Sequence, residues 1–90
     1  MVTVTDQAAE VFRATLDQTR TAPGQALRLL LRPGGGFGLG LDQEREGDRV
    51  VTADGEKILL VMPAIAEAVG QATIDAEETE EGPKLVISRQ

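Results

Sequence analysis

The chain contains no cysteine, histidine, tryptophan or tyrosine among its 90 residues, and its only aromatic residues are Phe12 and Phe37. Without cysteine no disulfide can form, and neither a thiolate nor an imidazole is available as a ligand for a soft metal ion. The common arrangements of nucleophile and base in enzymes also depend on cysteine or histidine. We therefore expect a protein that is not an enzyme and that carries no cofactor.

Long apolar runs and clusters of basic residues are absent as well. No segment approaches the ~18 apolar residues of a membrane span, and residues 1–6 lack the features of a signal peptide. We therefore expect a cytoplasmic protein with no membrane partner. The net charge is −6, from nine basic and fifteen acidic residues. Nucleic acid is not an expected partner, because binding phosphates requires clustered Lys and Arg.

The acidic residues concentrate toward the end of the chain, where residues 58–83 contain six acids and no base. The simplest interpretation is a solvated acidic surface that aids solubility. Binding of a divalent cation through the carboxylates of residues 77–81 stays open, since Ca²⁺ and Mg²⁺ prefer oxygen ligands. This segment lacks the regular Asp/Asn and Gly spacing of dedicated calcium loops. Its four acids are Glu77, Glu78, Glu80 and Glu81.

Sequence patterns predict one α+β domain over residues 1–90, a small, mostly antiparallel mixed sheet or sandwich with two helices. Thr5 is a typical N-cap for a helix from Asp6 to about Thr19. Pro63 favours the start of a second helix, which Gly70 ends. The expected order is β-α-β-β-β-β-α-β-β. Strands are predicted at residues 2–4, 25–32, 37–41, 49–52, 58–61, 72–76 and 84–88, and a turn at residues 77–83.

The densest local feature is a glycine cluster. Five of the ten glycines lie within residues 34–40, directly after the predicted strand at residues 25–32. In that strand every second residue from Leu27 to Leu31 is leucine, which predicts that one face is buried and the other exposed. Glycine permits positive φ and close approach of a ligand or a second backbone segment. The cluster is therefore either a tight connection between strands or a cradle for a ligand.

The order of these segments resembles the A-type iron–sulfur carrier family, which has HesB-like domains and includes the IscA type. The resemblance covers nearly the whole chain. Six segments carry it: Thr5-Asp6-Gln7-Ala8-Ala9, Leu27-Arg28-Leu29-x-Leu31-Arg32, Gly34-Gly35-Gly36-Phe37-Gly38-Leu39, Val50-Val51-x-x-Asp54-Gly55-x-Lys57-Ile58, Ala72-Thr73-Ile74-Asp75 and Gly82-Pro83-Lys84-Leu85-Val86-Ile87. The resemblance implies a HesB-like fold and a connection to iron–sulfur or sulfur metabolism.

The family's chemistry does not carry over with its fold. Members that hold iron or a cluster use one cysteine in the glycine-rich loop and two in a Cys-Gly-Cys motif after the last strand. In this sequence Gly36 stands at the first position, and residues 88–90 read Ser-Arg-Gln. We therefore expect a cysteine-free, degenerate member that binds no cluster through cysteine.

The main hypothesis is a non-catalytic accessory or regulatory protein that acts through protein–protein contacts in iron–sulfur or sulfur metabolism. The oligomeric state, monomer or dimer, stays open. The candidate contact loop consists of Arg32, Gly34, Gly35, Gly36, Phe37 and Gly38. Phe37 has two interpretations, an exposed contact residue or, from its alternation with Leu39, a core residue.

The alternative hypothesis is a module that binds a small anionic ligand. The backbone N–H groups of residues 34–40 would form the cradle, and Arg28 and Arg32 would supply positive charge. The Lys-Ser/Thr ending of a P-loop is absent.

Overall fold

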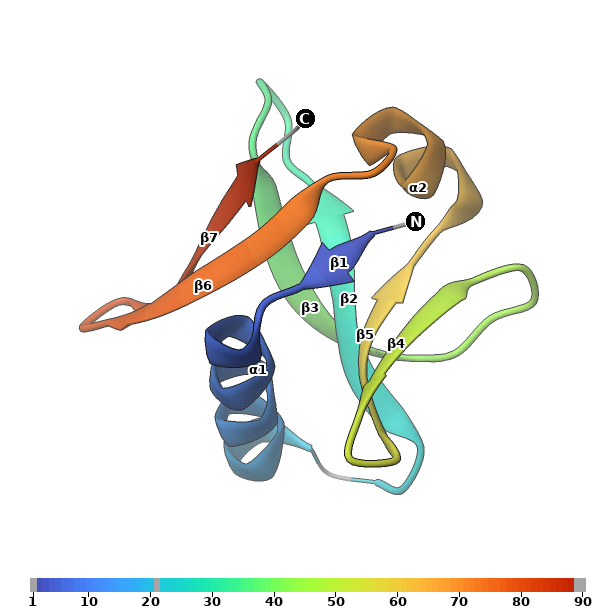
Figure 1. Ribbon diagram of the computed structural model, residues 1–90. Coiled ribbons are helices and arrows are strands. Elements are labelled where there is room, and N and C mark those ends of the chain that lie inside the picture. The colour runs from blue at the N-terminus through green and yellow to red at the C-terminus, as the bar shows by residue number, and fades with distance from the viewer. Residues whose placement is uncertain (1, 21, 89–90) are drawn as a thin grey trace.

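The computed structural model describes residues 2–20 and 22–88 (Figure 1). In this part of the chain the predicted order of strands and helices is confirmed. The bounds are β1 (Thr3–Val4), α1 (Asp6–Thr19), β2 (Gln25–Leu31), β3 (Phe37–Gln43), β4 (Arg49–Ala53), β5 (Glu56–Val61), α2 (Pro63–Val69), β6 (Thr73–Thr79) and β7 (Gly82–Ser88).

The two helices begin and end where the sequence predicts. Thr5 caps α1 by accepting a hydrogen bond from the backbone N–H of Ala8 at 3.1 Å. Pro63 occupies the first turn of α2, and Gly70 follows the helix with a positive φ of 60°. Neither helix in the described residues combines the length and the apolar content that crossing a lipid bilayer requires.

The strands form two mixed sheets, with orders β1-β6-β7 and β3-β2-β5-β4. Only the pairs β1–β6 and β2–β5 are parallel, and the remaining neighbours are antiparallel. In Figure 1 the loop between β2 and β3 lies at the same end of the molecule as α2. The turn between β4 and β5 lies at the opposite end. The expected α+β class with mostly antiparallel strands is therefore confirmed.

The core lies between the two sheets and α1. Phe12 and Leu16 of α1 are fully buried, in one cluster with Leu29 and Leu59 of the four-stranded sheet and Ile74 of the three-stranded sheet. Burying a side chain of this size contributes about 1.5–3 kcal/mol. The helix thereby holds the two sheets together and fixes the position of the loops at their ends.

Two predictions about the strands are wrong. Residues 77–83 do not form one long turn, because β6 continues to Thr79 and β7 starts at Gly82. Antiparallel pairing of β6 with β7 extends both strands through the acidic segment, and the only residues left between them are Glu80 and Glu81. The third predicted strand also extends beyond residue 41, to Gln43, because β3 pairs with β2 along its full length.

Candidate functional site

The glycine loop, defined here as residues 33–36, connects β2 to β3 and is exposed over its whole length. The backbone N–H of Arg32 donates to the carbonyl of Gly36 at 3.0 Å, and the N–H of Gly35 donates to the carbonyl of Arg32 at 3.1 Å. Gly34, Gly35 and Gly36 have φ angles of 85°, 101° and 81°. Residues that have a side chain rarely adopt this left-handed backbone region, so the loop conformation depends on the three glycines.

Exposed leucines lie directly beside this loop. Leu30 and Leu31 are 40% and 60% exposed, although alternation along the strand predicted that Leu31 is buried. The end of β2 extends past the core, so Leu31 is not covered. The exposure of Leu30 follows from the alternation, because consecutive residues of a strand point to opposite faces. The exposure of Leu31 does not, since Leu31 shares a face with the buried Leu29.

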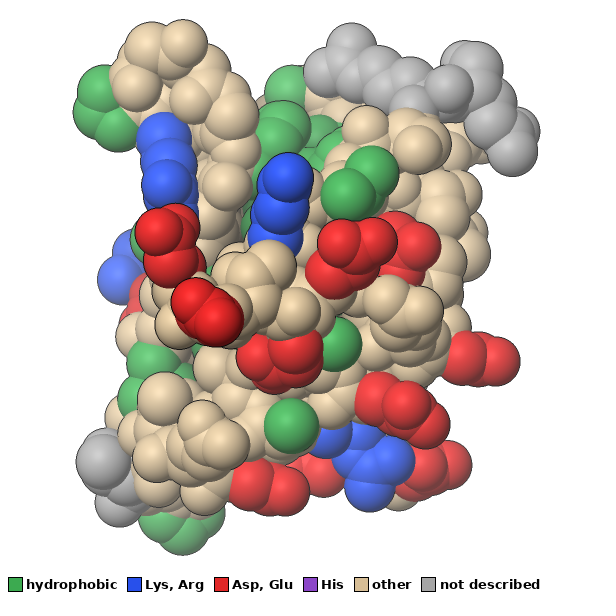
Figure 2. Space-filling model, turned by 90° about the vertical axis from the view of Figure 1, so that its left-hand side faces the viewer, with side chains coloured by type: hydrophobic (Ala, Val, Ile, Leu, Met, Phe, Trp, Pro, Cys, Tyr) green, Lys and Arg blue, Asp and Glu red, His purple; other side chains and the backbone are tan. Residues whose placement is uncertain are grey.

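The candidate contact residues border a groove between the edge strands β3 and β7. It has a volume of about 720 Å³ and is lined by Arg32, Phe37, Gly38 and Leu39 on one side and by residues 79–85 on the other. Figure 2 shows this side of the molecule. Hydrophobic side chains lie in a hollow near its top, basic side chains lie next to that hollow, and acidic side chains cover much of the surface below.

The two basic residues of the groove are Arg32 and Lys84. Neither forms an ion pair or a side-chain hydrogen bond with another residue in the ranges that the structure describes. Their charges are therefore available to a binding partner. The guanidinium of Arg32 lies on Gly38, where an added Cβ would be 2.6 Å from Nε. A glycine at position 38 thus lets Arg32 lie flat along the groove.

Phe37 is both a core residue and part of the exposed surface, the two roles that the sequence left open. It is half-buried and packs against the hydrophobic core, yet it also lines the groove. Gly38 is buried beneath Arg32, while Gly34, Gly35 and Gly36 are exposed at the tip of the loop. The structure therefore brings Arg32, Phe37 and Gly38 to one surface, with the three loop glycines directly above it.

Arg28 does not belong to this surface, and its expected role as a second cation for an anion at the loop is wrong. The residue is only 3% exposed. Its Nε donates to Asp42 at 2.7 Å, its other two nitrogens donate to Asp48 at 2.9 and 2.6 Å, and one of these also reaches the carbonyl of Gln43 at 3.2 Å. Carboxylates from β3 and from the β3–β4 loop thus occupy the whole guanidinium.

This network shifts the pKa values of all three side chains. The hydrogen bond from Arg28 lowers the pKa of the Asp48 carboxyl, and burial opposes this shift only in part. The backbone N–H of Gln43 and then Arg28 lower the pKa of Asp42. The hydrogen bond to Asp48 raises the pKa of Arg28 above its ordinary value. All three groups stay charged at neutral pH, and the network fixes the β3–β4 loop against the sheet.

The residues at the loop do not fit an iron–sulfur cluster. Such clusters are held by cysteine thiolates, with histidine as the substitute, and the sequence contains neither residue. Within the described ranges, no group of three or more acidic side chains is placed to hold a metal ion. The open question of a cation at Glu77, Glu78, Glu80 and Glu81 gains no support, since these residues lie along β6 and its turn into β7.

No protein-family model matches the chain, and no curated protein matches it in sequence. Solved structures do match its fold. SufA of Escherichia coli, described as involved in the biosynthesis of iron–sulfur clusters, has a TM-score of 0.76 at 22% identity, over 98% of this chain and 84% of SufA. An Aquifex aeolicus protein solved by NMR has a TM-score of 0.74 at 28% identity, over 99% of this chain and 91% of that one.

A third match is IscA, crystallised with a [2Fe-2S] cluster. Its TM-score is 0.65 at 19% identity, over 99% of this chain and 82% of IscA. At these identities the likeness to SufA and IscA establishes the fold. The resemblance to A-type iron–sulfur carriers that the sequence indicated is confirmed at that level, in a chain without cysteine.

Proposed function

We propose that this chain is a non-catalytic accessory or regulatory protein of iron–sulfur or sulfur metabolism that acts by protein–protein contacts. One observation carries the proposal: a fold shared with SufA and IscA is combined with a sequence that has no thiolate and no imidazole. A protein of this kind retains the shape of a carrier but has no soft ligands for the cluster. Such a scaffold can still be recognised by other proteins through its surface.

The proposed contact surface is the glycine loop together with Leu31, Arg32 and the groove below them. Arginine is enriched at protein interfaces, and an exposed leucine beside it offers apolar area that a partner can bury, while the charge contributes specificity. The groove adds Lys84 as a second unpaired cation. Because Glu80 and Glu81 also line the groove, we infer a partner that presents an apolar side chain together with one acidic group placed to meet Arg32.

The partner is best identified by comparing matched variants rather than by capture alone. Wild-type protein, Arg32→Glu and Lys57→Glu would be immobilised and exposed to extract of the native cell, with recovered proteins identified by mass spectrometry. Lys57 is a suitable control because it is exposed, forms a single ion pair among the described residues, with Glu44 at 2.8 Å, and lies in the β4–β5 hairpin, toward the opposite end of the molecule (Figure 1). Both substitutions change the charge by the same amount.

The expected result is an iron–sulfur or sulfur-metabolism protein that wild-type and Lys57→Glu recover equally. Reversing the charge at Arg32 should weaken its binding about tenfold, which corresponds to the loss of one well-placed interface contact. Leu31→Ala should weaken binding in the same direction without affecting the core. If no protein of this class is recovered, or if Arg32→Glu binds as tightly as wild type, the proposed surface is wrong.

The alternative function, binding of a small anion at residues 34–40, has lost part of its basis. Arg28 is occupied by two carboxylates, and the N–H of Gly35 already donates to Arg32. Arg32 remains as a cation near the loop, so this alternative stays a prediction with one charged residue instead of two.

A further inference from the structure

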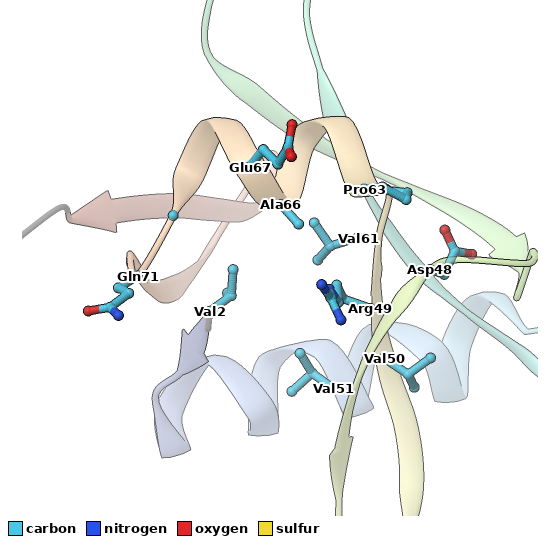
Figure 3. A pocket seen from close by; sticks show the side chains of 11 residues that line it. Val2, Asp48, Arg49, Val50, Val51, Val61, Pro63, Ala66, Glu67 and Gln71 are labelled. Atoms are coloured by element: carbon cyan, nitrogen blue, oxygen red, sulfur yellow. The ribbon is translucent and has the colours of Figure 1, made fainter.

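A second hollow lies on the other side of the sandwich, away from the glycine loop. It has a volume of about 820 Å³ and is bordered by Val2 just before β1, by β4, by the end of β5 and by α2. Figure 3 shows that its walls are largely apolar, with Val2, Val51, Val61 and Ala66 around the centre. The volume lies within the range of about 300–1,000 Å³ that is typical of sites for small molecules. No sequence pattern indicated this hollow, because its walls come from three separate segments.

Arg49 is the unusual residue in this hollow. It pairs across the strands with Val61, which is fully buried and belongs to the core cluster. Directly paired residues of neighbouring strands point to the same face of a sheet, so Arg49 lies on the inner face of β4. In Figure 3 its side chain lies among the valines. Arg49 is nevertheless exposed, so its guanidinium lies at the open rim of the hollow, where its donors are accessible to a ligand.

No partner for Arg49 exists in the parts of the chain that the structure describes, where it forms neither an ion pair nor a side-chain hydrogen bond. Two carboxylates line the same hollow. That of Asp48 is occupied by Arg28, at 2.6 and 2.9 Å. Glu67 lies on the exposed side of α2, and Figure 3 shows its carboxylate pointing away from Arg49.

We propose that this hollow binds a small molecule that has an apolar body and one carboxylate, such as a medium-chain carboxylic acid. The hydrocarbon would lie against the valines and Ala66, and the carboxylate would accept two hydrogen bonds from the Arg49 guanidinium, a geometry that arginine favours. The hydrocarbon would cover apolar wall residues of the hollow, and the carboxylate would meet donors at its rim that are otherwise exposed to solvent. The site is separate from the contact surface at the glycine loop and does not depend on the proposed function.

A charge on the inner face of an edge strand has a competing explanation. Such residues hinder the pairing of exposed edges between molecules and thereby oppose aggregation. The two explanations differ in what they require of Arg49: a ligand site requires its hydrogen-bond donors, whereas edge protection requires only its charge and bulk.

The test is a titration of the full chain with octanoate and, separately, with octanol, followed by amide NMR shifts. The proposal predicts saturable octanoate shifts centred on Val2, Val51, Val61 and Ala66, with little change at the glycine loop. Octanol, which has the same chain length without the charge, should bind about tenfold more weakly, as should octanoate to Arg49→Gln. Arg45→Gln is the matched control, because Arg45 is exposed and does not line the hollow.

Three results would overturn the proposal. One is the absence of octanoate shifts around the hollow in wild-type protein up to the solubility of the probe. The second is equal affinity for octanoate and octanol, which would remove the role of Arg49. The third is an Arg49→Gln variant that keeps full octanoate affinity but self-associates in sedimentation, which would assign the residue to edge protection. Failure of the partner experiment at Arg32 would leave this result unaffected.

Discussion

At the scale of single residues, the buried guanidinium of Arg28 is the group whose charge depends most on its protein partners. A charge this far from water is stable only when its hydrogen-bonding groups are matched, and removing one partner of a buried pair typically costs about 3–5 kcal/mol. Asp48 supplies two of the matching contacts, and its side chain is almost fully buried. The pair therefore anchors the β3–β4 loop over the outer face of β2.

We expect Asp48→Asn to lower the free energy of unfolding by about 3 kcal/mol, because it leaves a buried positive charge without its main partner. Asp17→Asn is the control, since Asp17 is exposed and its removal should change stability by less than about 1 kcal/mol. Urea unfolding followed by circular dichroism measures both values; tryptophan fluorescence cannot be used, because the chain has no tryptophan. Equal midpoints for the two variants would contradict the anchoring role.

The same residue predicts how stability depends on pH. The pKa of Asp48 is lowered in the folded state, while the unfolded chain has the ordinary value of about 3.9. As the pH falls, the unfolded state therefore binds its proton first, and stability decreases from about pH 5 downward until the folded pKa is passed. The stabilisation is fully present above the unfolded pKa. In Asp48→Asn the acid limb of the stability curve should be shallower.

At the scale of elements, Thr5 joins two parts of the fold. Its hydroxyl accepts from the N–H of Ala8 at 3.1 Å and donates to Asp75 of β6 at 2.7 Å. It thus caps α1 and ties the start of the helix to the three-stranded sheet. We expect Thr5→Ala to destabilise the protein by about 1 kcal/mol, the usual cost of losing an N-cap.

Thr5→Ser is the matched control for this prediction, because serine keeps the hydroxyl and caps equally well. Thermal unfolding by circular dichroism should place the serine variant near wild type and the alanine variant clearly below it. An alanine variant with wild-type stability would show that water replaces both hydrogen bonds of Thr5 at no net cost.

Helices were predictable from the sequence because their end signals are local. Thr5, Pro63 and Gly70 each act within one turn of the helix, so the bounds followed from neighbouring residues. Strand ends depend instead on partners that are distant in sequence. The acidic residues that suggested a turn at 77–83 lie in a paired hairpin, and the burial of Arg28 depends on Asp42 and Asp48 across a loop. The position of the glycine loop between β2 and β3 was predictable from its glycines, while its role as a contact surface stays a prediction.

At the scale of the whole molecule, the absence of soft ligands is the property that distinguishes this chain from a cluster carrier of the same fold. We expect purified protein to stay colourless and to retain no stoichiometric iron after anaerobic incubation with ferrous iron and sulfide, followed by desalting. Association between copies does not change this expectation, because every copy lacks the same donors. Absorbance in the visible range and an iron assay measure the outcome; stable uptake of iron would mean that oxygen ligands suffice.

The positive φ angles of the glycine loop also limit which residues can be introduced into it. A cysteine introduced at position 36 would inherit a backbone with φ near 81°, a conformation that costs a residue with a side chain about 1–2 kcal/mol. Gly34 and Gly35 also have positive φ angles, so a cysteine placed at either of these positions instead would be strained in the same way. A thiol in this turn would therefore be strained, and it would still supply only one of the several ligands that an iron–sulfur cluster requires.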